Sequence, residues 1–154
     1  MFIAIYCCDI RNGIGKNNKM PWVNKEELDL FKKITNNHNV FMGRKTFDSI
    51  DRKPLIGRNN FVISKTLEKA NGITIINDLN DIFKYNDTKL NFIIGGKSII
   101  EQTYKKCKFL FVSNLSNNYD CDIKLEIDYY TNFELYKIIQ FKTFYLAIWK
   151  SKII

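Results

Sequence analysis

The sequence predicts one α/β domain over residues 1–154, with a mostly parallel sheet of about eight strands, an antiparallel hairpin at the C-terminal edge and about four flanking helices. Three observations predict this fold. Short apolar runs recur along the chain with turn-forming residues between them, which is typical of buried strands. Segments with helical periodicity separate the earlier runs, and this alternation is typical of parallel sheets. A length of 154 residues suffices for one hydrophobic core but not for two ordinary ones.

The individual elements follow from these patterns in chain order. Strands are expected at Phe2–Cys8, Val40–Met42, Phe61–Ile63, Ile73–Ile76, Phe92–Ile94, Phe109–Leu115, Lys137–Phe141 and Phe144–Trp149. Helices are expected at Lys25–Thr35, Lys45–Ile50, Leu79–Tyr85 and Lys97–Lys106. The last two strands are joined near Lys142-Thr143, so we expect them to form the antiparallel edge hairpin.

Composition excludes several classes of protein. A hydrophobic fraction of 45% with only 2 Pro and 7 Gly is typical of a packed globular protein and not of a disordered one. No apolar run approaches the roughly 18 residues that a membrane span needs, and the opening run meets Asp9 without a basic lead or cleavage site. The 4 Cys include no CxxC pair and there is 1 His, so no zinc site is expected. We therefore expect a cytoplasmic protein without metal or membrane contact.

The net charge of +8 leaves a basic nucleic-acid-binding module as a less favoured alternative. The basic residues are scattered, and the aromatic residues fall in expected strands, which favours core packing over nucleic-acid contact. Nearly all basic residues are Lys, so the remaining arginines are candidates for sites that need a rigid bidentate fork. These arginines are Arg11, Arg44, Arg52 and Arg58.

Residues 12–22 make a longer loop than a strand-to-helix connection needs. Gly13 and Gly15 give the loop conformational freedom, and Met20 and Trp22 lie near its end. Such a loop is either a lid over a binding site or a mobile solvated loop with Met20 and Trp22 docked on the core. The residues alone leave both interpretations open.

Glu27 lies at the centre of the apolar face of the first expected helix. At about 100° per residue, Leu30, Phe31 and Ile34 all fall within about 60° of it. Burial there would raise the pKa of the carboxyl group and suit it to proton transfer near neutral pH. The alternative is a capping box, in which Asn24 is the N-cap and Glu27 follows three residues later.

Two expected strand ends are followed by groups that bind phosphate. Gly43-Arg44-Lys45-Thr46 follows one strand and opens a helix, and Ser64-Lys65 follows the next strand. Amides, cations and hydroxyls at such positions favour an anion, and the two sites together indicate a ligand with more than one phosphate group. A third strand ends in Gly95-Gly96, where the backbone can approach a ligand closely, although a tight turn is the commoner reason for such a pair.

In their order and spacing these motifs resemble those of dihydrofolate reductases. The resemblance runs from Ile3 to about Asp122, and more loosely to the end of the chain. It rests on Met20-Pro21-Trp22, on Glu27, Leu28 and Phe31, on Met42-Gly43-Arg44-Lys45-Thr46, on Leu55 with Gly57-Arg58, and on Ile94-Gly95-Gly96. It implies a cytoplasmic, monomeric enzyme of one-carbon metabolism that reduces 7,8-dihydrofolate to tetrahydrofolate with NADPH.

The resemblance also implies residue roles. Glu27 would bind the pterin and assist protonation of nitrogen 5, Trp22 would hold a water near it, and Ser113 would hydrogen-bond its carboxylate. The implied substrate-binding residues are Ile5, Leu28, Phe31, Ile50, Leu55, Ile94 and Arg58, the last of which would take the glutamate carboxylate. The implied cofactor-binding residues are Cys7, Ile14, Gly15, Met20, Gly43, Arg44, Lys45, Thr46, Ser64, Lys65, Gly95, Gly96, Lys97 and Ser98.

The sequence departs from the family pattern at a few positions. Ile100 stands where many relatives carry a Tyr near the nicotinamide, and Ser113, Phe47 and Tyr6 also differ from the usual residues. The nearest alternative function is that of the riboflavin-pathway reductase, which shares the fold and NADPH but acts on a ribosyl-phosphate substrate. That alternative does not explain Glu27 beside Trp22.

The remaining polar residues carry no predicted role. His38, Asp9, Arg11 and Arg52 are expected at the surface, in contact with solvent. Cys7 and Cys8 are neighbours on one strand, so their side chains should face opposite sides of the sheet and cannot pair with each other.

Overall fold

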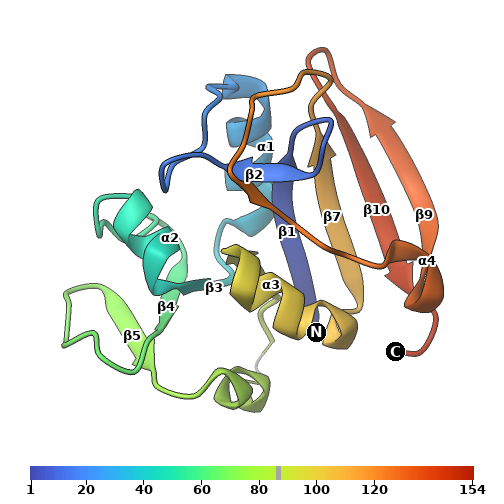
Figure 1. The fold of residues 1–154 in the computed structure, drawn as a ribbon. Coiled ribbons are helices and arrows are strands. Elements are labelled where there is room, and N and C mark those ends of the chain that lie inside the picture. Colours follow the sequence, from blue (N-terminus) through green and yellow to red (C-terminus); the bar gives the residue numbers. More distant parts are fainter. Residues whose placement is uncertain (86–87) are drawn as a thin grey trace.

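An eight-stranded sheet forms the centre of the computed structural model, which describes residues 1–85 and 88–154 (Figure 1). The strands are β1 (Phe2–Cys8), β3 (Asn39–Gly43), β4 (Asn59–Ile63), β5 (Ile73–Ile76), β6 (Asn91–Gly95), β7 (Phe109–Asn114), β9 (Phe133–Gln140) and β10 (Tyr145–Ser151). Their order in the sheet is β5-β4-β3-β6-β1-β7-β10-β9. The first six pair in parallel, and β10 and β9 pair antiparallel at one edge. The predicted α/β fold is confirmed.

Helices cover both faces of the sheet, as its buried parallel strands require. α1 (Lys25–Thr35) and α2 (Arg44–Ser49) contribute Phe31 and Phe47 to a cluster with the odd-numbered residues Ile3 and Ile5 of β1. α3 (Lys97–Thr103) contributes Ile100 to a second cluster, with the even-numbered residues of β1. Figure 1 shows α3 in front of the sheet and α1 behind it. In the described part of the chain, no helix is long and apolar enough to cross a membrane.

The shorter helical segments differ from the prediction. Leu79–Tyr85 was expected to be an α-helix, but Leu79–Lys84 is a 3₁₀ helix, η1, with one buried residue, Ile82. The segment is only six residues long, and 3₁₀ geometry is common in such short connecting helices. The expected helix Lys97–Lys106 changes from α to the 3₁₀ helix η2 (Tyr104–Lys106). A further short helix, α4 (Tyr129–Asn132), was not predicted.

A second, two-stranded sheet was also not predicted. β2 (Gly13–Gly15) lies in the loop that the sequence predicts to be irregular, and it pairs antiparallel with β8 (Ile123–Lys124). Neither segment has the length or the alternation of a strand. The pairing depends on a partner more than one hundred positions away, which no local pattern indicates.

For two residues, the expectation of exposure to solvent is wrong. Asp9 is 2% exposed, and His38 is half-buried. His38 Nδ1 accepts the backbone N–H of Leu90 at 3.0 Å, and the ring lies edge-on to Phe92. Polar neighbours in the sequence suggested exposure for His38, but its burial is decided by β6, which is distant in the chain.

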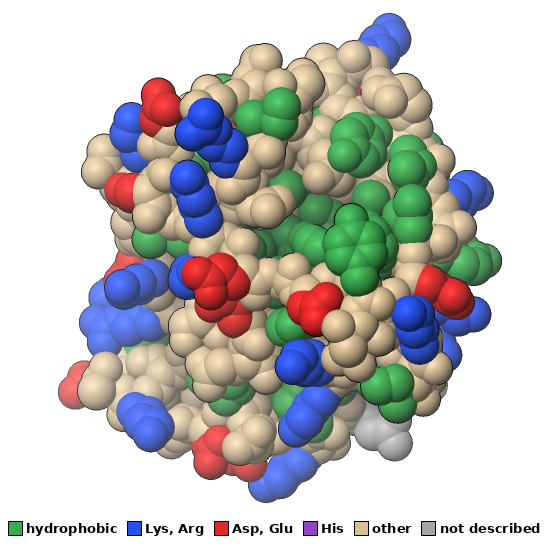
Figure 2. Space-filling view, turned by 45° about the vertical axis from the view of Figure 1, so that its right-hand side comes forward, with side chains coloured by type: hydrophobic (Ala, Val, Ile, Leu, Met, Phe, Trp, Pro, Cys, Tyr) green, Lys and Arg blue, Asp and Glu red, His purple; other side chains and the backbone are tan. Residues whose placement is uncertain are grey.

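The cysteines and the surface charges are arranged as the sequence suggested. Cys7 and Cys8 pack in different clusters on the two sides of β1, and all 4 cysteines are free and buried. On the face shown in Figure 2, Lys and Arg side chains are interspersed with acidic and hydrophobic ones. This face therefore presents no continuous basic surface.

Candidate active site

The pairing between β1 and β6 stops before either strand ends. The last paired residues are Ala4 and Ile93, whereas β1 continues to Cys8 and β6 to Gly95. On its other side, β1 stays paired with β7 as far as Cys8. The two parallel strands therefore separate at their carboxyl ends, beside Ile5 and Ile94. This is where open α/β sheets bind their ligands.

Glu27 enters this region from the first turn of α1 and is 9% exposed. Asn24 caps the helix, because its Oδ1 accepts the backbone N–H of Glu27 at 3.0 Å. The carboxylate of Glu27 accepts a hydrogen bond from the Ser113 hydroxyl of β7. Burial raises the pKa of Glu27, and the Ser113 hydrogen bond offsets only part of that rise. The site therefore holds a buried carboxyl group that is protonated more readily than an exposed one.

Cys7 lies next to this carboxyl group on β1, in register with Ser113 of β7. Burial, and then the negative charge of Glu27, raise the pKa of the Cys7 thiol far above its usual range. A thiol held in its neutral form is a poor nucleophile. Cys7 therefore contributes shape to the site and no covalent chemistry.

Trp22 is buried, and its indole N–H has no partner. The ring meets the edge of Tyr119 with centroids 5.3 Å apart and packs in one cluster with Cys7. Within residues 1–85 and 88–154, Nε1 of Trp22 is the one buried side-chain polar atom that makes no hydrogen bond. An unpaired buried donor is costly, so this N–H is suited to a water or a ligand atom.

A cavity of about 670 Å³ opens beside α1 and the segment after α2. Its lining is basic and apolar: Lys32, Lys33, Asn36, Ile50, Lys53, Pro54, Leu55, Ile56 and Arg58. Arg58 is half-buried, with Nη1 donating to Thr35 Oγ1 at 3.1 Å and its guanidinium carbon 6.0 Å from the Phe31 ring centroid. Three of the predicted substrate residues, Ile50, Leu55 and Arg58, thus meet in one cavity. Leu28 is 43% exposed and lies outside the lining.

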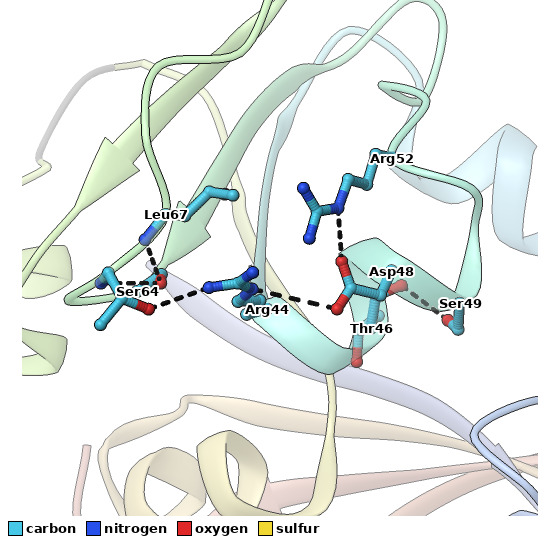
Figure 3. A network of polar contacts seen from close by, with 8 residues as sticks. Arg44, Thr46, Asp48, Ser49, Arg52, Ser64 and Leu67 are labelled. Atoms are coloured by element: carbon cyan, nitrogen blue, oxygen red, sulfur yellow. Dashed lines mark hydrogen bonds and ion pairs between the residues drawn. The ribbon is translucent and has the colours of Figure 1, made fainter.

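An ion-pair network holds Arg44 at the start of α2 (Figure 3). Its Nη1 donates to Thr66 Oγ1 at 2.9 Å, and its Nε lies 3.9 Å from Asp48 Oδ2. Asp48 is shared, because its Oδ1 also accepts from Nε of Arg52 at 2.7 Å. The guanidinium of Arg44 is therefore oriented toward the turn that follows β4.

That turn is organised by Ser64. The Ser64 hydroxyl accepts the backbone N–H groups of Thr66 at 3.3 Å and Leu67 at 3.0 Å (Figure 3). Lys65 projects from the same turn and is exposed, as is Lys45 in the first turn of α2. Cations and hydroxyls from the ends of β3 and β4 thus converge on one surface, which suits an anion such as a phosphate.

Glycines bring α2 close to the junction of β6 and α3. Gly95 has φ of +140°, a conformation that favours glycine, and the Gly95-Gly96 peptide is cis. A Cβ atom at either glycine would lie 3.3 Å from Thr46 Oγ1, and one at Gly43 would lie 3.0 Å from Cγ1 of Ile99. This bare backbone beside a phosphate-type donor set fits a dinucleotide cofactor.

The loop that carries Met20 lies along the same edge. Asp122 donates its backbone N–H to the Gly15 carbonyl and accepts the N–H of Asn17, both at 3.1 Å. Gly15 is buried and Ile14 half-buried, whereas Met20 is exposed. At the start of α3, Lys97 Nζ donates to the Lys124 carbonyl at 2.6 Å, and Ser98 accepts from Gln102.

Comparison with known proteins decides the family. The model of the dihydrofolate reductase family matches residues 1–143. The chain belongs to the dihydrofolate reductase family. It is 39% identical to the dihydrofolate reductase of Ureaplasma parvum over 99% of this chain and 98% of that protein. It is 36% identical to the one of Mycoplasma genitalium, over 99% of both chains.

A solved structure of a family member shows the same fold. Dihydrofolate reductase from Enterococcus faecalis, complexed with NADP(H) and RAB-propyl, superposes with a TM-score of 0.91 at 21% sequence identity. The match covers 99% of this chain and 96% of that one. As a member of the dihydrofolate reductase family, the chain is an NADPH-dependent oxidoreductase.

Three residues near the site were missed by sequence reasoning. Thr66 orients Arg44, Tyr119 packs on Trp22, and Asp9 binds the backbone of the neighbouring loops. Only Asp9 could have been identified from the sequence. It directly follows a fully apolar strand and precedes Gly13 by four residues, and an acidic residue at such a position favours a turn in which its side chain binds backbone N–H groups. Thr66 and Tyr119 lie in polar stretches without a recognisable pattern.

Proposed function

We propose that this chain catalyses the reduction of 7,8-dihydrofolate to 5,6,7,8-tetrahydrofolate with NADPH, as a cytoplasmic monomer. The observation that carries the proposal is the buried carboxyl group of Glu27, which lies against Cys7 and Ser113 near the carboxyl ends of β1 and β7. A pterin ring presents an amino group and an adjacent ring nitrogen, and one carboxylate can bind both. The riboflavin-pathway substrate offers no comparable reason to keep a carboxyl group at this position.

Glu27 orients the pterin and assists the proton transfer. The Ser113 hydroxyl hydrogen-bonds its carboxylate and so orients it toward the pterin. Because burial raises the pKa of Glu27, the group binds a proton at a higher pH than an exposed Glu does. Trp22, with its unpaired Nε1, holds a water through which the proton reaches pterin nitrogen 5.

Bound NADPH supplies the hydride that carbon 6 of the pterin receives. Arg44, Lys45, Ser64 and Lys65 hold the adenosine 2′-phosphate, and Thr46 at the start of α2 holds the pyrophosphate. The backbones of Ile5 and Ile94 bind the pterin amino group. Cys7, Ile14 and the Gly95-Gly96 peptide flank the nicotinamide. A phosphate-binding set of this kind favours NADPH over NADH.

The cavity beside α1 takes the other end of the substrate. Ile50 and Leu55 supply apolar contacts for the aminobenzoyl group. Arg58 faces the same cavity, and its planar fork matches a glutamate carboxylate in a bidentate pair. Arginine stays protonated even where burial lowers its pKa, so this partner remains charged.

The test is the loss of NADPH absorbance when dihydrofolate is added to the purified protein, with NADH in parallel. We expect a rapid loss that strongly prefers NADPH. Binding of NADPH without turnover of dihydrofolate, but with turnover of the ribosyl-phosphate pyrimidine, would move the assignment to the riboflavin-type reaction. The matched variant is Glu27→Gln, which keeps the shape of the side chain but replaces the ionisable carboxyl group with an amide that does not titrate.

A further inference from the structure

Asp9 is a buried carboxylate that the proposed chemistry does not use. It follows β1 directly and is 2% exposed. Its Oδ1 accepts the backbone N–H groups of Arg11 at 2.9 Å and Gly13 at 2.8 Å, and its Oδ2 accepts that of Tyr119 at 3.0 Å. Burial alone would raise the pKa of Asp9, but these three backbone hydrogen bonds, together with one from the Cys121 thiol, outweigh burial and hold the pKa below its usual value. The group therefore stays ionised.

Two of the three donors belong to loops that are far apart in the sequence, and the third, Arg11, lies in the turn between β1 and β2. Gly13 opens the Met20 loop, residues 13–24, and Tyr119 lies in the brace loop, residues 115–122. The backbone repeats this link, because Asp9 donates to the Gly13 carbonyl at 2.9 Å and Ile10 donates to the Asn117 carbonyl at 3.1 Å. Both loops are thus tied to the end of β1 through one side chain and its neighbours.

Gly13 packs directly against the brace loop, with no space for a side chain between them. A Cβ atom at Gly13 would lie 2.4 Å from Cβ of Cys121 and 2.9 Å from Oδ1 of Asp9. The Cys121 thiol also hydrogen-bonds the Asp9 carboxylate. Gly13, Asp9 and Cys121 therefore form a close-packed junction, in which the carboxylate is the one charged group.

The brace loop reaches the active site through Tyr119. Its ring meets Trp22 in an edge contact with centroids 5.3 Å apart, and both side chains pack in the cluster that includes Cys7. The Oδ2 hydrogen bond fixes the backbone of Tyr119, and so fixes the surface against which the indole rests. A shift of Tyr119 would move the unpaired Nε1 of Trp22 relative to Glu27.

We propose that Asp9 is a positioning residue for the reduction, one that clamps the Met20 loop to the brace loop and, through Tyr119, holds the Trp22 indole in its working place. The inference rests on the proposed function for its effect on turnover. Its structural half, that Asp9 fixes Trp22, is independent of the substrate. Misplacement of a catalytic group by about 1 Å can cost up to about a hundredfold in rate, so a clamp of this kind has a measurable effect.

The experiment uses Trp22 as its own reporter. The chain has 2 Trp, and Trp149 packs on Tyr129 and Tyr130 away from the site, so Trp149→Phe serves as the parent. Asp9→Asn keeps the size of the side chain but replaces one acceptor oxygen with a donor. Asp128→Asn is the matched control, because Asp128 also accepts two backbone N–H groups, those of Tyr130 and Thr131, at the start of α4.

In the parent without ligands, we expect Asp9→Asn to shift the Trp22 emission to longer wavelength and to increase its quenching by acrylamide. With dihydrofolate and NADPH, we expect kcat to fall about tenfold while the Kd for NADPH stays within about twofold, because Arg44 and Ser64 are untouched. Asp128→Asn should change neither the emission nor kcat. An unchanged Trp22 emission together with an unchanged kcat in folded Asp9→Asn overturns the proposal.

A second variant covers the case in which Asp9→Asn does not fold. Tyr119→Leu leaves the clamp intact, because Asp9 binds only the backbone there, but it removes the ring that supports Trp22. The proposal requires the same emission shift and a similar loss of kcat, and the absence of both rejects it. If the parent itself fails to reduce dihydrofolate, the proposed function fails and with it the role in turnover. The emission of Trp22 then still decides whether Asp9 holds it.

Discussion

The pterin side and the phosphate side of the site are built in opposite ways. On the proposed pterin side, Glu27 is buried, Trp22 packs in an apolar cluster, and the Ser113 hydroxyl hydrogen-bonds the carboxylate. On the phosphate side, Arg44 and Asp48 keep more than a third of their side-chain surface exposed and belong to a network that includes Arg52. Burial therefore controls the protonation of the first region, whereas ion pairing controls the geometry of the second. The two regions should respond differently to mutation, pH and salt.

The largest effect is expected from Glu27→Gln. The loss of the ionisable group should lower kcat/KM for dihydrofolate by about 10² to 10⁴ at neutral pH, the range in which acid catalysis contributes. NADPH binding, measured by fluorescence titration, should stay within about twofold, because the phosphate side is separate. Turnover close to that of the unmodified protein would contradict the role of Glu27.

The next effect is on cofactor selection. Arg44→Gln should raise the KM for NADPH by about tenfold to a hundredfold, since a hydrogen bond to a charged group contributes about 1.5–3 kcal/mol. The KM for NADH, which lacks the 2′-phosphate, should hardly change. Arg11→Gln at an exposed arginine is the control. Equal losses for both cofactors would show that Arg44 supports the fold and does not select the phosphate.

The pH dependence separates the two regions further. Since the pKa of Glu27 is raised, kcat/KM should fall as pH rises through that pKa, and Glu27→Gln should flatten the profile. Stability follows the same sign: the folded state binds the proton more tightly than the unfolded state, whose pKa is near 4.5, so stability is lost as pH rises above that value. As the pH rises from 5 to 8, the melting temperature of the unmodified chain should therefore fall relative to that of Glu27→Gln.

The smallest effect is expected at Asp48. Asp48→Asn removes two partly exposed ion pairs, and because the pair with Arg44 contributes about 0.2–1 kcal/mol, the KM for NADPH should change by at most about fivefold. Raising the salt concentration should reduce this difference, because exposed charges are screened. The same salt should leave the Glu27→Gln defect unchanged. If the loss of kcat/KM in Glu27→Gln changed with salt concentration, Glu27 would be accessible to solvent ions, which would contradict its burial.

Burial explains which parts of the molecule were predictable. The strands were predicted because each is a local run of apolar residues. The burial of Glu27 was predicted because its neighbours along the helix define an apolar face, and Glu27 lies at the centre of that face. The proposed phosphate site was predicted as a set of residue types, but the pairing of Arg44 with Asp48 and Thr66 required the turn after β4 to be in place. Its details depend on the fold and not on sequence spacing.

The errors have the same origin. β2 and β8 are far apart in the sequence, and each forms a strand only by pairing with the other. Asp9 was expected at the surface, yet the backbone of Tyr119, 110 positions further along the chain, binds its carboxylate. A buried charge satisfied by backbone amides leaves no periodic signal, so only the folded chain reveals it.

The central place of β1 has a consequence for the making of the protein. Phe2–Cys8 leaves the ribosome well before its neighbours in the sheet, Asn91–Gly95 and Phe109–Asn114, have been translated. At synthesis rates of about 5–20 residues per second, an uninterrupted apolar segment waits on the order of ten seconds for its partners. While the segments between β1 and β7 are translated, the nascent chain therefore carries an unpaired apolar strand, which favours binding by chaperones.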